Sequence, residues 1–280
     1  MTVVVKIGGA KAVEPAGALA DIAALVGEGE PVAVVHGGST AVDETLERMG
    51  IEPEYVETPD GVVGRFTDEE TMDVFKMAMA GLVNTDLVTG LRNAGADAVG
   101  LSGVDGGLLV GPRKSAVRVV EDGRKRIRRG DHSGTIRGVN VDLLASLLED
   151  GYVPVASPPM LGDEGEDADS RFTAVNTDAD RASAAVAGEL GATLVSLTDV
   201  EGVYRDPEDP STLIEDVATP EEYEELKRAA EGFMGRKVMA ATEALERGAR
   251  EVVVADANAD RPVRAALEGG GTHIHPEAIQ

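Results

Sequence analysis

Short runs of β-branched and other apolar residues alternate along the chain with segments in which apolar residues recur every three to four positions. The short runs predict buried strands, and the other segments predict amphipathic helices. Strands are expected at 2–7, 31–35, 96–101, 152–157, 193–197 and 251–255, and helices at 15–27, 39–49, 139–149, 177–190 and 231–247. A further long helix begins at Thr67, because Thr67 and Glu70 have the spacing of a capping box. Regular alternation of this kind favours an α/β fold with a mainly parallel open sheet.

Two segments depart from the alternation. Residues 108–128 predict an antiparallel β-hairpin, since the turn residues at 121–123 separate two strand-like runs. The acidic stretch 162–167 predicts a solvated loop. We therefore expect an N-terminal lobe over 1–172 and a C-terminal lobe over 173–280.

The composition is strongly acidic: the 280 residues carry a formal net charge of -25 at pH 7. Such a surface is typical of proteins adapted to high salt, where ions screen the repulsion between carboxylates. It argues against nucleic acid as a partner, because phosphate contacts need positive charge. Cys is absent, which excludes disulfides and thiolate metal sites. The sequence contains neither an apolar run long enough to span a membrane nor a signal-peptide pattern, so we expect a cytoplasmic protein.

Glycine-rich turns follow the first two predicted strands. Lys6 and the glycine pair 8–9 end the first strand, and the glycine pair 37–38 ends the second. Glycines let backbone N–H groups approach a phosphate closely, and a lysine adds positive charge. Because the carboxyl ends of parallel strands meet at one edge of a sheet, both turns are expected to face one ligand site. His36 is interpreted as a turn residue that satisfies its own hydrogen bonds.

Together with these turns, several ordered motifs resemble the amino-acid kinase family, and within it the acetylglutamate kinase branch. The motifs are LSGVDG at 101–106, NTD at 176–178, LTDVEGVY at 197–204 and MGRK at 234–237. The resemblance spans nearly the whole chain. It implies a three-layer αβα sandwich similar to carbamate kinase, with acceptor binding and dimerisation in the N-terminal lobe and ATP binding in the C-terminal lobe. It also implies a homodimer.

The resemblance implies transfer of the γ-phosphoryl group of ATP to a side-chain carboxylate. A carboxylate is already a nucleophile at neutral pH, so catalysis should consist of positioning and charge compensation. Lys6 and Lys237 would flank the transferred group, and Asp178 would hold both lysines. The nucleotide would be bound by Lys6, Gly8, Gly9, Thr198, Asp199, Tyr204 and Lys237. Mg²⁺ would arrive with ATP and bridge its phosphates, without a metal site formed by the protein.

On the acceptor side, the resemblance assigns substrate binding to Gly37, Gly38, Ser39, Arg65 and Asn176. Arg65 would hold the acceptor's α-carboxylate, because a guanidinium binds a planar carboxylate through two N–H groups. Two positions depart from the family pattern. Ala174, two residues before the 176–178 motif, replaces an asparagine, and Ser39 replaces a third glycine. Both departures imply that the acceptor's amino substituent differs from the acetyl group of acetylglutamate.

The predicted hairpin is an island of positive charge. Nine basic residues lie between positions 113 and 137, against three acidic ones. A charge run of this kind is usually a solvated surface, but here it would also attract an acidic partner. Residues 55–71 and 103–109 further resemble kinases whose glutamate or aminoadipate substrate is attached to the small acidic carrier protein LysW. Carrier docking is therefore assigned to Arg113, Lys114, Arg124, Lys125, Arg126, Arg128 and Arg129.

The leading hypothesis is an ATP-dependent kinase of LysW-bound glutamate or aminoadipate in arginine or lysine biosynthesis. The two acceptors differ by one methylene, and the sequence leaves the choice between them open. An acetylglutamate kinase acting on the free metabolite is the nearest alternative. A non-catalytic amino-acid sensor of the same fold is another, and the intact lysines at positions 6 and 237 argue against it.

Overall fold

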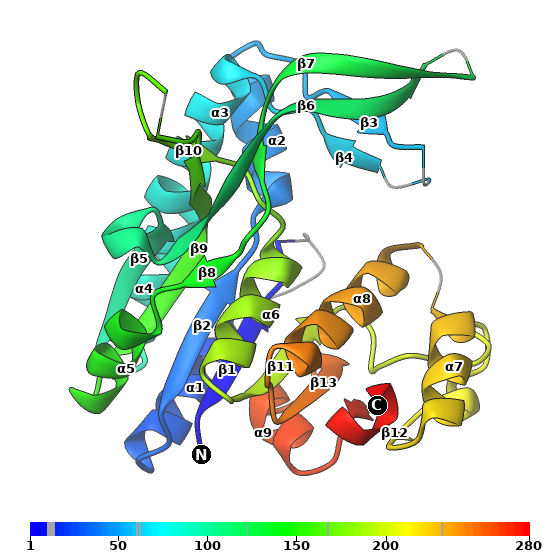
Figure 1. Ribbon diagram of the computed structural model, residues 1–280. Helices are drawn as coiled ribbons and strands as arrows, with labels where there is room; N and C mark the ends of the chain where they lie inside the picture. Colours follow the sequence, from blue (N-terminus) through cyan, green and yellow to red (C-terminus); the bar gives the residue numbers. More distant parts are fainter. Residues whose placement is uncertain (10–14, 60, 62, 122, 167, 231) are drawn as a thin grey trace.

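A parallel strand buried on both sides lies at the centre of the sheet. The computed structural model describes residues 1–9, 15–59, 61, 63–121, 123–166, 168–230 and 232–280 (Figure 1). Strand β1 (Val3–Ile7) is buried along its whole length and pairs in parallel with β11 (Thr193–Thr198) and β2 (Val32–His36). Two more parallel neighbours, β13 (Glu251–Asp256) and β9 (Val153–Asp163), extend the sheet on either side. A mainly parallel sheet is thus confirmed.

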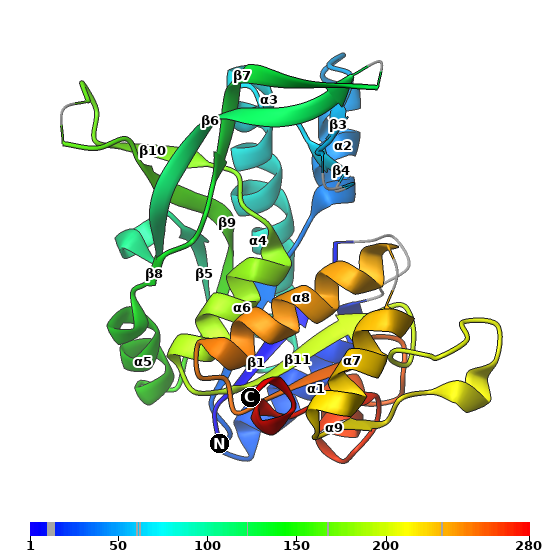
Figure 2. The same cartoon turned by 45° about the vertical axis from the view of Figure 1, so that its right-hand side comes forward.

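The margins of the sheet are mixed. At one margin β14 (Thr272–Ile274) is antiparallel to β13 and parallel to β12 (Asp216–Val217). At the other, β9 pairs in parallel with β5 (Ala98–Gly103) and β6 (Leu109–Glu121), and antiparallel with β10 (Phe172–Val175). The remaining strands, β7 (Arg124–Gly134) and β8 (Gly138–Val139), are antiparallel to β6. The β6–β7 pair is the predicted hairpin, and it projects from the body of the molecule (Figures 1 and 2).

Helices cover both faces of the sheet, so the sandwich has three layers. Helices α1 (Pro15–Gly27), α4 (Asn84–Asn93) and α9 (Pro262–Leu267) share one buried core with Val3, Val5 and Ile7. The opposite core contains Val4 and residues of α5 (Val141–Glu149), α6 (Ala179–Glu189), α7 (Pro220–Ala229) and α8 (Gly232–Glu246). Successive side chains of a strand point to opposite faces. Lys6 therefore points to the same face as Val4, where α6 and α8 lie.

A smaller hydrophobic core lies beyond the end of β2. It joins α2 (Ser39–Arg48), α3 (Glu69–Lys76) and a π-helical segment, Met77–Val83, that continues into α4. The two-stranded hairpin of β3 (Tyr55–Glu57) and β4 (Val63–Arg65) lies beneath β6 and β7 (Figure 1). This arrangement brings the end of β4 next to the start of α2.

The predicted capping box at Thr67 is wrong. Helix α3 is capped by Asp68, whose side chain accepts a hydrogen bond from the backbone N–H of Thr71. Thr67 is buried, and its hydroxyl accepts instead from the side-chain amide of Asn176. Asp caps a helix as well as Thr does, so the tertiary contact of Thr67 decides which residue caps α3.

Of the acidic stretch 162–167, residue 167 lies outside the described residues, and residues 162–166 are only partly a loop. Gly162 and Asp163 belong to β9 and pair with Thr173 and Phe172 of β10. The sheet therefore continues across the predicted lobe boundary, and the division into two lobes stays a prediction. None of the helices in the described part of the chain is long and apolar enough to cross a membrane.

Candidate functional site

A buried lysine and a partly buried lysine meet one carboxylate where the sheet faces α6 and α8. The ammonium group of Lys6 lies 2.6 Å from a carboxylate oxygen of Asp180, and that of Lys237 lies 3.9 Å from the same oxygen. Lys6 is 5% exposed. Strand alternation directs Lys6 toward α6, whose second residue is Asp180, while α8 supplies Lys237. Segments far apart in sequence thus form one charged cluster.

The predicted role of Asp178 belongs to Asp180. Asp178 is the N-cap of α6, and its side chain accepts hydrogen bonds from the backbone N–H groups of Asp180 and Arg181. A carboxylate turned back onto its own helix satisfies orphan N–H donors at that helix end. The prediction that Asp178 holds both lysines is therefore wrong, and the carboxylate that does so lies two positions later.

This correction shifts one of the two departures from the family pattern to another position. Counted from Asp180 instead of Asp178, the asparagine expected at position 174 falls on Asn176, while the first asparagine of the Asn-x-Asp motif falls on Asp178. Ala174 lies in β10 and packs against the core formed by α2 and α3. Ala174 therefore no longer supports a different acceptor substituent, whereas Ser39 is unaffected.

The cluster carries excess positive charge. Burial by itself raises the pKa of Asp180, but the charges of Lys6 and Lys237 outweigh burial, so the pKa falls below its usual value. Burial, followed by the neighbouring charge of Lys6, lowers the pKa of Lys237. Two cations against one partly buried anion leave a site that favours a further anionic group.

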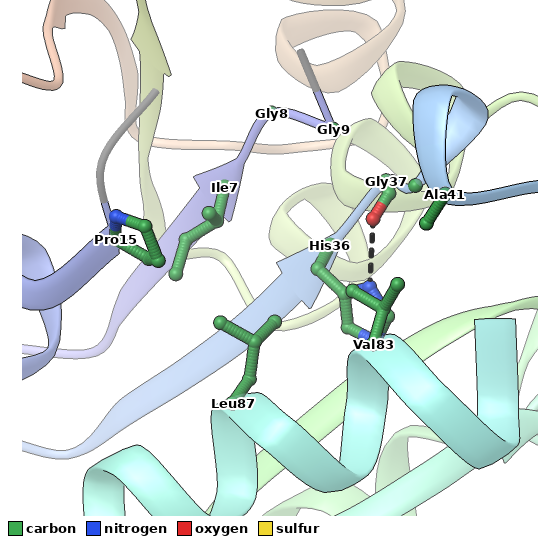
Figure 3. Close-up of a pocket in the computed structure, with 10 residues that line it drawn as sticks. Ile7, Gly8, Gly9, Pro15, His36, Gly37, Ala41, Val83 and Leu87 are labelled. Atoms are coloured by element: carbon green, nitrogen blue, oxygen red, sulfur yellow. Dashed lines mark hydrogen bonds between the residues drawn. The ribbon is translucent and has the colours of Figure 1, made fainter. Parts of the chain in front are cut away.

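The two glycine turns touch each other at the carboxyl edge of β1 and β2. A Cβ on Gly9 would lie 2.6 Å from the Cα of Gly38, so no larger residue fits at position 9 without a backbone shift. Figure 3 shows Gly9 beside Gly37 at the ends of the two strands. A cavity of about 140 Å³ adjoins these turns. It is lined by Ile7, Gly8, Gly9, Pro15, His36, Gly37, Gly38, Ala41, Val83 and Leu87.

His36 holds the second turn in place. Its Nδ1 lies 2.9 Å from the carbonyl oxygen of Gly37 (Figure 3). Its Nε2 lies 3.0 Å from the side-chain nitrogen of Asn84. An amide nitrogen donates, so Nε2 accepts and Nδ1 donates to the carbonyl, as in a neutral imidazole. Burial lowers the pKa of His36 to about 4, which keeps the ring neutral. The interpretation of His36 as a turn residue is confirmed.

Arg65, the last residue of β4, lies beside the start of α2, and one of its N–H groups lacks a hydrogen-bond partner in the described part of the chain. Its Nη2 lies 2.7 Å from Asp43 and donates to the backbone oxygen and the hydroxyl of Ser39, both at 3.0 Å. The hydroxyl of Tyr55 is 3.1 Å away. The Nε of Arg65 is buried with no partner among the described residues. Asp43 and Tyr55 were not predicted, because no motif marks residues that only orient an arginine.

Asn176 connects this region to the basic hairpin. Its side chain donates to the hydroxyl of Thr67 at 3.0 Å, and its backbone N–H donates to the carbonyl oxygen of His132 at 2.8 Å. His132 in turn donates from its backbone to Thr67. The base of β7 is therefore part of the wall that contains Asn176.

The end of β11 and the residues that follow it lie near Lys237. The hydroxyl of Thr198 donates to Asp199 at 3.1 Å, and the hydroxyl of Tyr204 donates to Glu201 at 3.2 Å. The charge of Asp199 acts on Lys237, where it favours the protonated ammonium. Among the described residues, no group of three or more His, Asp or Glu side chains is arranged to hold a metal ion.

The predicted docking residues of the basic hairpin fall into two groups, those that form ion pairs and those that form none with a described residue. Arg113 pairs with Glu164, Arg126 with Glu121, and Arg128 with Glu54. The other predicted docking residues are exposed and form no ion pair with a described residue. They are Lys114, Arg124, Lys125 and Arg129. The predicted docking set thus contains residues that stabilise the hairpin as well as residues that remain available.

Comparison with known proteins gives a consistent result. A family model described as amino acid kinase family matches residues 1–256. The LysW-aminoadipate kinase of Thermus thermophilus is 42% identical over 274 residues, which cover 97% of this chain and 99% of that protein. The acetylglutamate kinase of Methanopyrus kandleri is 43% identical over 274 residues, with the same coverage of both chains. Overall identity therefore does not separate these two kinds of relative.

Among solved structures, carbamate kinase from Giardia lamblia bound to AMP-PNP has a TM-score of 0.68 at 17% identity, and the match covers 98% of each chain. At this identity the likeness concerns the fold alone. The predicted three-layer sandwich similar to carbamate kinase is confirmed.

Proposed function

Because this chain belongs to the amino acid kinase family, we propose that it transfers the γ-phosphoryl group of ATP to the side-chain carboxylate of glutamate or aminoadipate attached to LysW. The product is an acyl phosphate, as arginine or lysine biosynthesis requires. The observation that carries the proposal is the pair of Lys6, which is buried, and Lys237, which is partly buried, both held by Asp180. A site with excess positive charge stabilises a phosphoryl group in transfer.

The reaction requires the protein mainly to position the two reactants and to compensate their negative charges. A carboxylate oxygen of the acceptor attacks the γ-phosphorus, the bond to the β–γ bridging oxygen breaks, and ADP leaves. No general base is required, because the acceptor carboxylate is already ionised. The obstacle is repulsion between two anions, and Lys6 and Lys237 reduce it. A unit charge about 4 Å away is worth roughly 4 kcal/mol at an effective dielectric constant near 20, before desolvation is deducted.

The nucleotide enters as its magnesium complex, on the side of the C-terminal lobe. Backbone N–H groups of the first glycine turn would contact the phosphates, and the segment after β11 would line the nucleotide. The residues assigned to this role are Lys6, Gly8, Gly9, Thr198, Asp199, Tyr204 and Lys237.

The acceptor is assigned to the wall formed by the second glycine turn, Ser39, Arg65 and Asn176. The buried Nε of Arg65 has no partner among the described residues. An unmet buried donor costs free energy that a bound carboxylate would recover. Asp43 holds the guanidinium in place while its Nε stays available.

The choice of a carrier-borne acceptor rests on the basic hairpin. A free metabolite needs no extended positive surface, whereas a small acidic protein does. The relative named LysW-aminoadipate kinase supports the same choice, and the acetylglutamate kinase relative keeps free acetylglutamate as the second candidate. A non-catalytic sensor would have no need of two lysines that share one carboxylate at the phosphoryl site.

The decisive experiment traps the acyl phosphate. The purified enzyme is incubated with ATP, Mg²⁺ and hydroxylamine in molar salt, with acetylglutamate, LysW-glutamate or LysW-aminoadipate supplied separately. Hydroxamate formed from a carrier-borne acceptor supports the proposal and identifies the preferred side chain. Hydroxamate formed only from acetylglutamate selects the second candidate, and no hydroxamate from any acceptor contradicts kinase activity.

We also propose that the protein is a homodimer that pairs through the groove between α2 and the π-helical segment. Met49, Met77 and Leu82 are 54%, 52% and 45% exposed there. The groove lining contains Arg48 and no acidic residue, so two copies of this acidic chain would meet here without contact between carboxylates. Light scattering should give twice the mass of one chain for the native protein and a monomer for Met77→Lys. An unchanged mass in that variant would contradict this choice of surface.

A further inference from the structure

We propose that the acidic carrier docks on one face of the β6–β7 hairpin, which we call the outer face. It is defined by the side chains of Arg118, Lys125, Ile127 and Arg129. The inference rests on the proposed function, because it names the surface that a carrier-borne acceptor would engage. It also narrows the docking surface, since several cations predicted for docking lie on the opposite face, and it adds Arg118 and Ile127.

Strand register assigns these residues to one face. Residues directly opposite each other in an antiparallel pair share a face. Arg118 lies opposite Ile127, Val120 opposite Lys125, and Ala116 opposite Arg129. The three basic side chains are exposed and form no ion pair with a described residue. None of these six residues is acidic, so the face is purely positive and apolar.

The opposite face is occupied by the protein itself. Val119, directly opposite Arg126, is 1% exposed. Arg128 stacks over the ring of Phe66, with its guanidinium carbon 3.9 Å from the ring centroid, and pairs with Glu54. The hairpin overlies β3 and β4 in both views (Figures 1 and 2). Arg128 therefore holds the hairpin to the body, while Arg126 on the same face pairs with Glu121 of the neighbouring strand.

The outer face has the composition of a docking surface for an acidic protein. Ile127 is 66% exposed, the largest exposure among the large apolar side chains described. An apolar anchor surrounded by charges that match the partner is the usual anatomy of a specific interface. The net charge of -25 repels an acidic partner elsewhere on the surface, so this face would also direct the carrier's approach.

The hairpin is joined to the acceptor wall at its base. Backbone bonds connect His132 of β7 with both Thr67 and Asn176. Arg129 lies three residues before His132 in the same strand. A carrier held on the outer face is therefore held at the margin of the acceptor site, where a flexible tail can deliver its carboxylate.

The test compares two triple variants that lose the same charge. The outer-face variant is Arg118→Ala, Lys125→Ala and Arg129→Ala, and the control is Lys227→Ala, Arg228→Ala and Arg250→Ala. Calorimetric titration with LysW-glutamate, in 0.2 M and 2 M KCl, measures binding without ATP. We expect the outer-face variant to bind about tenfold more weakly or worse at 0.2 M KCl, and the control within about twofold of the native protein. Circular dichroism confirms that each variant is folded.

A single variant, Ile127→Ser, tests the apolar anchor without changing charge. We expect it to weaken binding about fivefold or more, with little dependence on salt. Equal binding by the outer-face variant and the control would overturn the proposal. An equal loss in Arg124→Ala with Arg126→Ala would also overturn it, since the effect would then belong to the whole hairpin. Failure of the native enzyme to phosphorylate any carrier-borne acceptor would instead contradict the proposed function.

Discussion

Asp180 shows that the role of a side chain in this site depends on its position in a helix. Asp178 and Asp180 are chemically identical and two residues apart. Asp178 caps α6 through backbone N–H groups, whereas Asp180 faces Lys6 and Lys237. The sequence alone could not separate them, because both carboxylates follow the same asparagine within the start of one helix.

At this scale, the first prediction concerns Asp180→Asn. The two ammonium groups would lose their shared anion and repel each other, so Lys237 would be less well aligned and would hold its proton less tightly. We expect kcat in the hydroxamate assay to fall by about 100-fold or more. Asp178→Ala is the matched control: it should lower the free energy of unfolding by about 1 kcal/mol through loss of the cap and leave kcat within a few-fold. The reverse ranking of the two variants would contradict the assignment.

A second prediction concerns the pH dependence of Lys237. Burial and the charge of Lys6 lower its pKa below the ordinary lysine value of 10.5. The ammonium is present below the pKa and lost as pH rises through it, so kcat should decline on the alkaline side before an ordinary lysine would titrate. Lys237→Arg keeps its charge at all accessible pH values, so its residual activity should lack this decline. An identical alkaline limb in both proteins would exclude Lys237 as its source.

At the scale of elements, the sequence predicts the central sheet well because its strands are buried on both sides. The runs at 2–7, 31–35 and 193–197 match β1, β2 and β11 to within one residue. The strands that were missed, such as β3 and β4, are three residues long and partly exposed. Their pairing depends on tertiary contacts, which local pattern does not encode.

The contact between the glycine turns leads to a third prediction. Gly9→Ala would place a Cβ against the backbone of Gly38, and rigid backbone cannot yield as a side chain can. We expect about 1–3 kcal/mol of destabilisation and a large loss of kcat/KM for ATP. Gly27→Ala, at the end of α1 with open space around its Cβ position, is the control. Its unfolding midpoint in denaturant should stay at or slightly above that of the native protein.

At the scale of the molecule, the site is assembled from segments that sequence motifs identify separately but cannot place together. Lys6, Asp180 and Lys237 come from a strand and two helices, and they meet only because all three lie on one face of the sheet. The motifs predict both lysines. The supports around Arg65 follow no repeat or spacing, so only the structure reveals Asp43 and Tyr55.

The net charge of -25 leads to a prediction for the whole chain. Dispersed carboxylates repel each other in the folded state, and salt screens that repulsion, with a Debye length of about 3 Å at 1 M ionic strength. The melting temperature should therefore rise steadily between 0.1 M and 2 M KCl. Calorimetry measures this change, and a melting temperature that is flat or falls over that range would contradict adaptation to high salt.

The burial of β1 on both sides has a consequence for its register in the sheet, that is, for which of its residues face each core. In a strand with one solvent-exposed face, polar and apolar side chains alternate. A shift in register by one residue would then expose every apolar side chain and bury every polar one. The valines of β1 would fit either core, so hydrophobicity hardly distinguishes the correct register from one shifted by a single residue. Lys6 does, because a shift by one residue would bury its ammonium between α1 and α9, away from Asp180. The same side chain that we assign to the reaction thus also sets the register of the first strand.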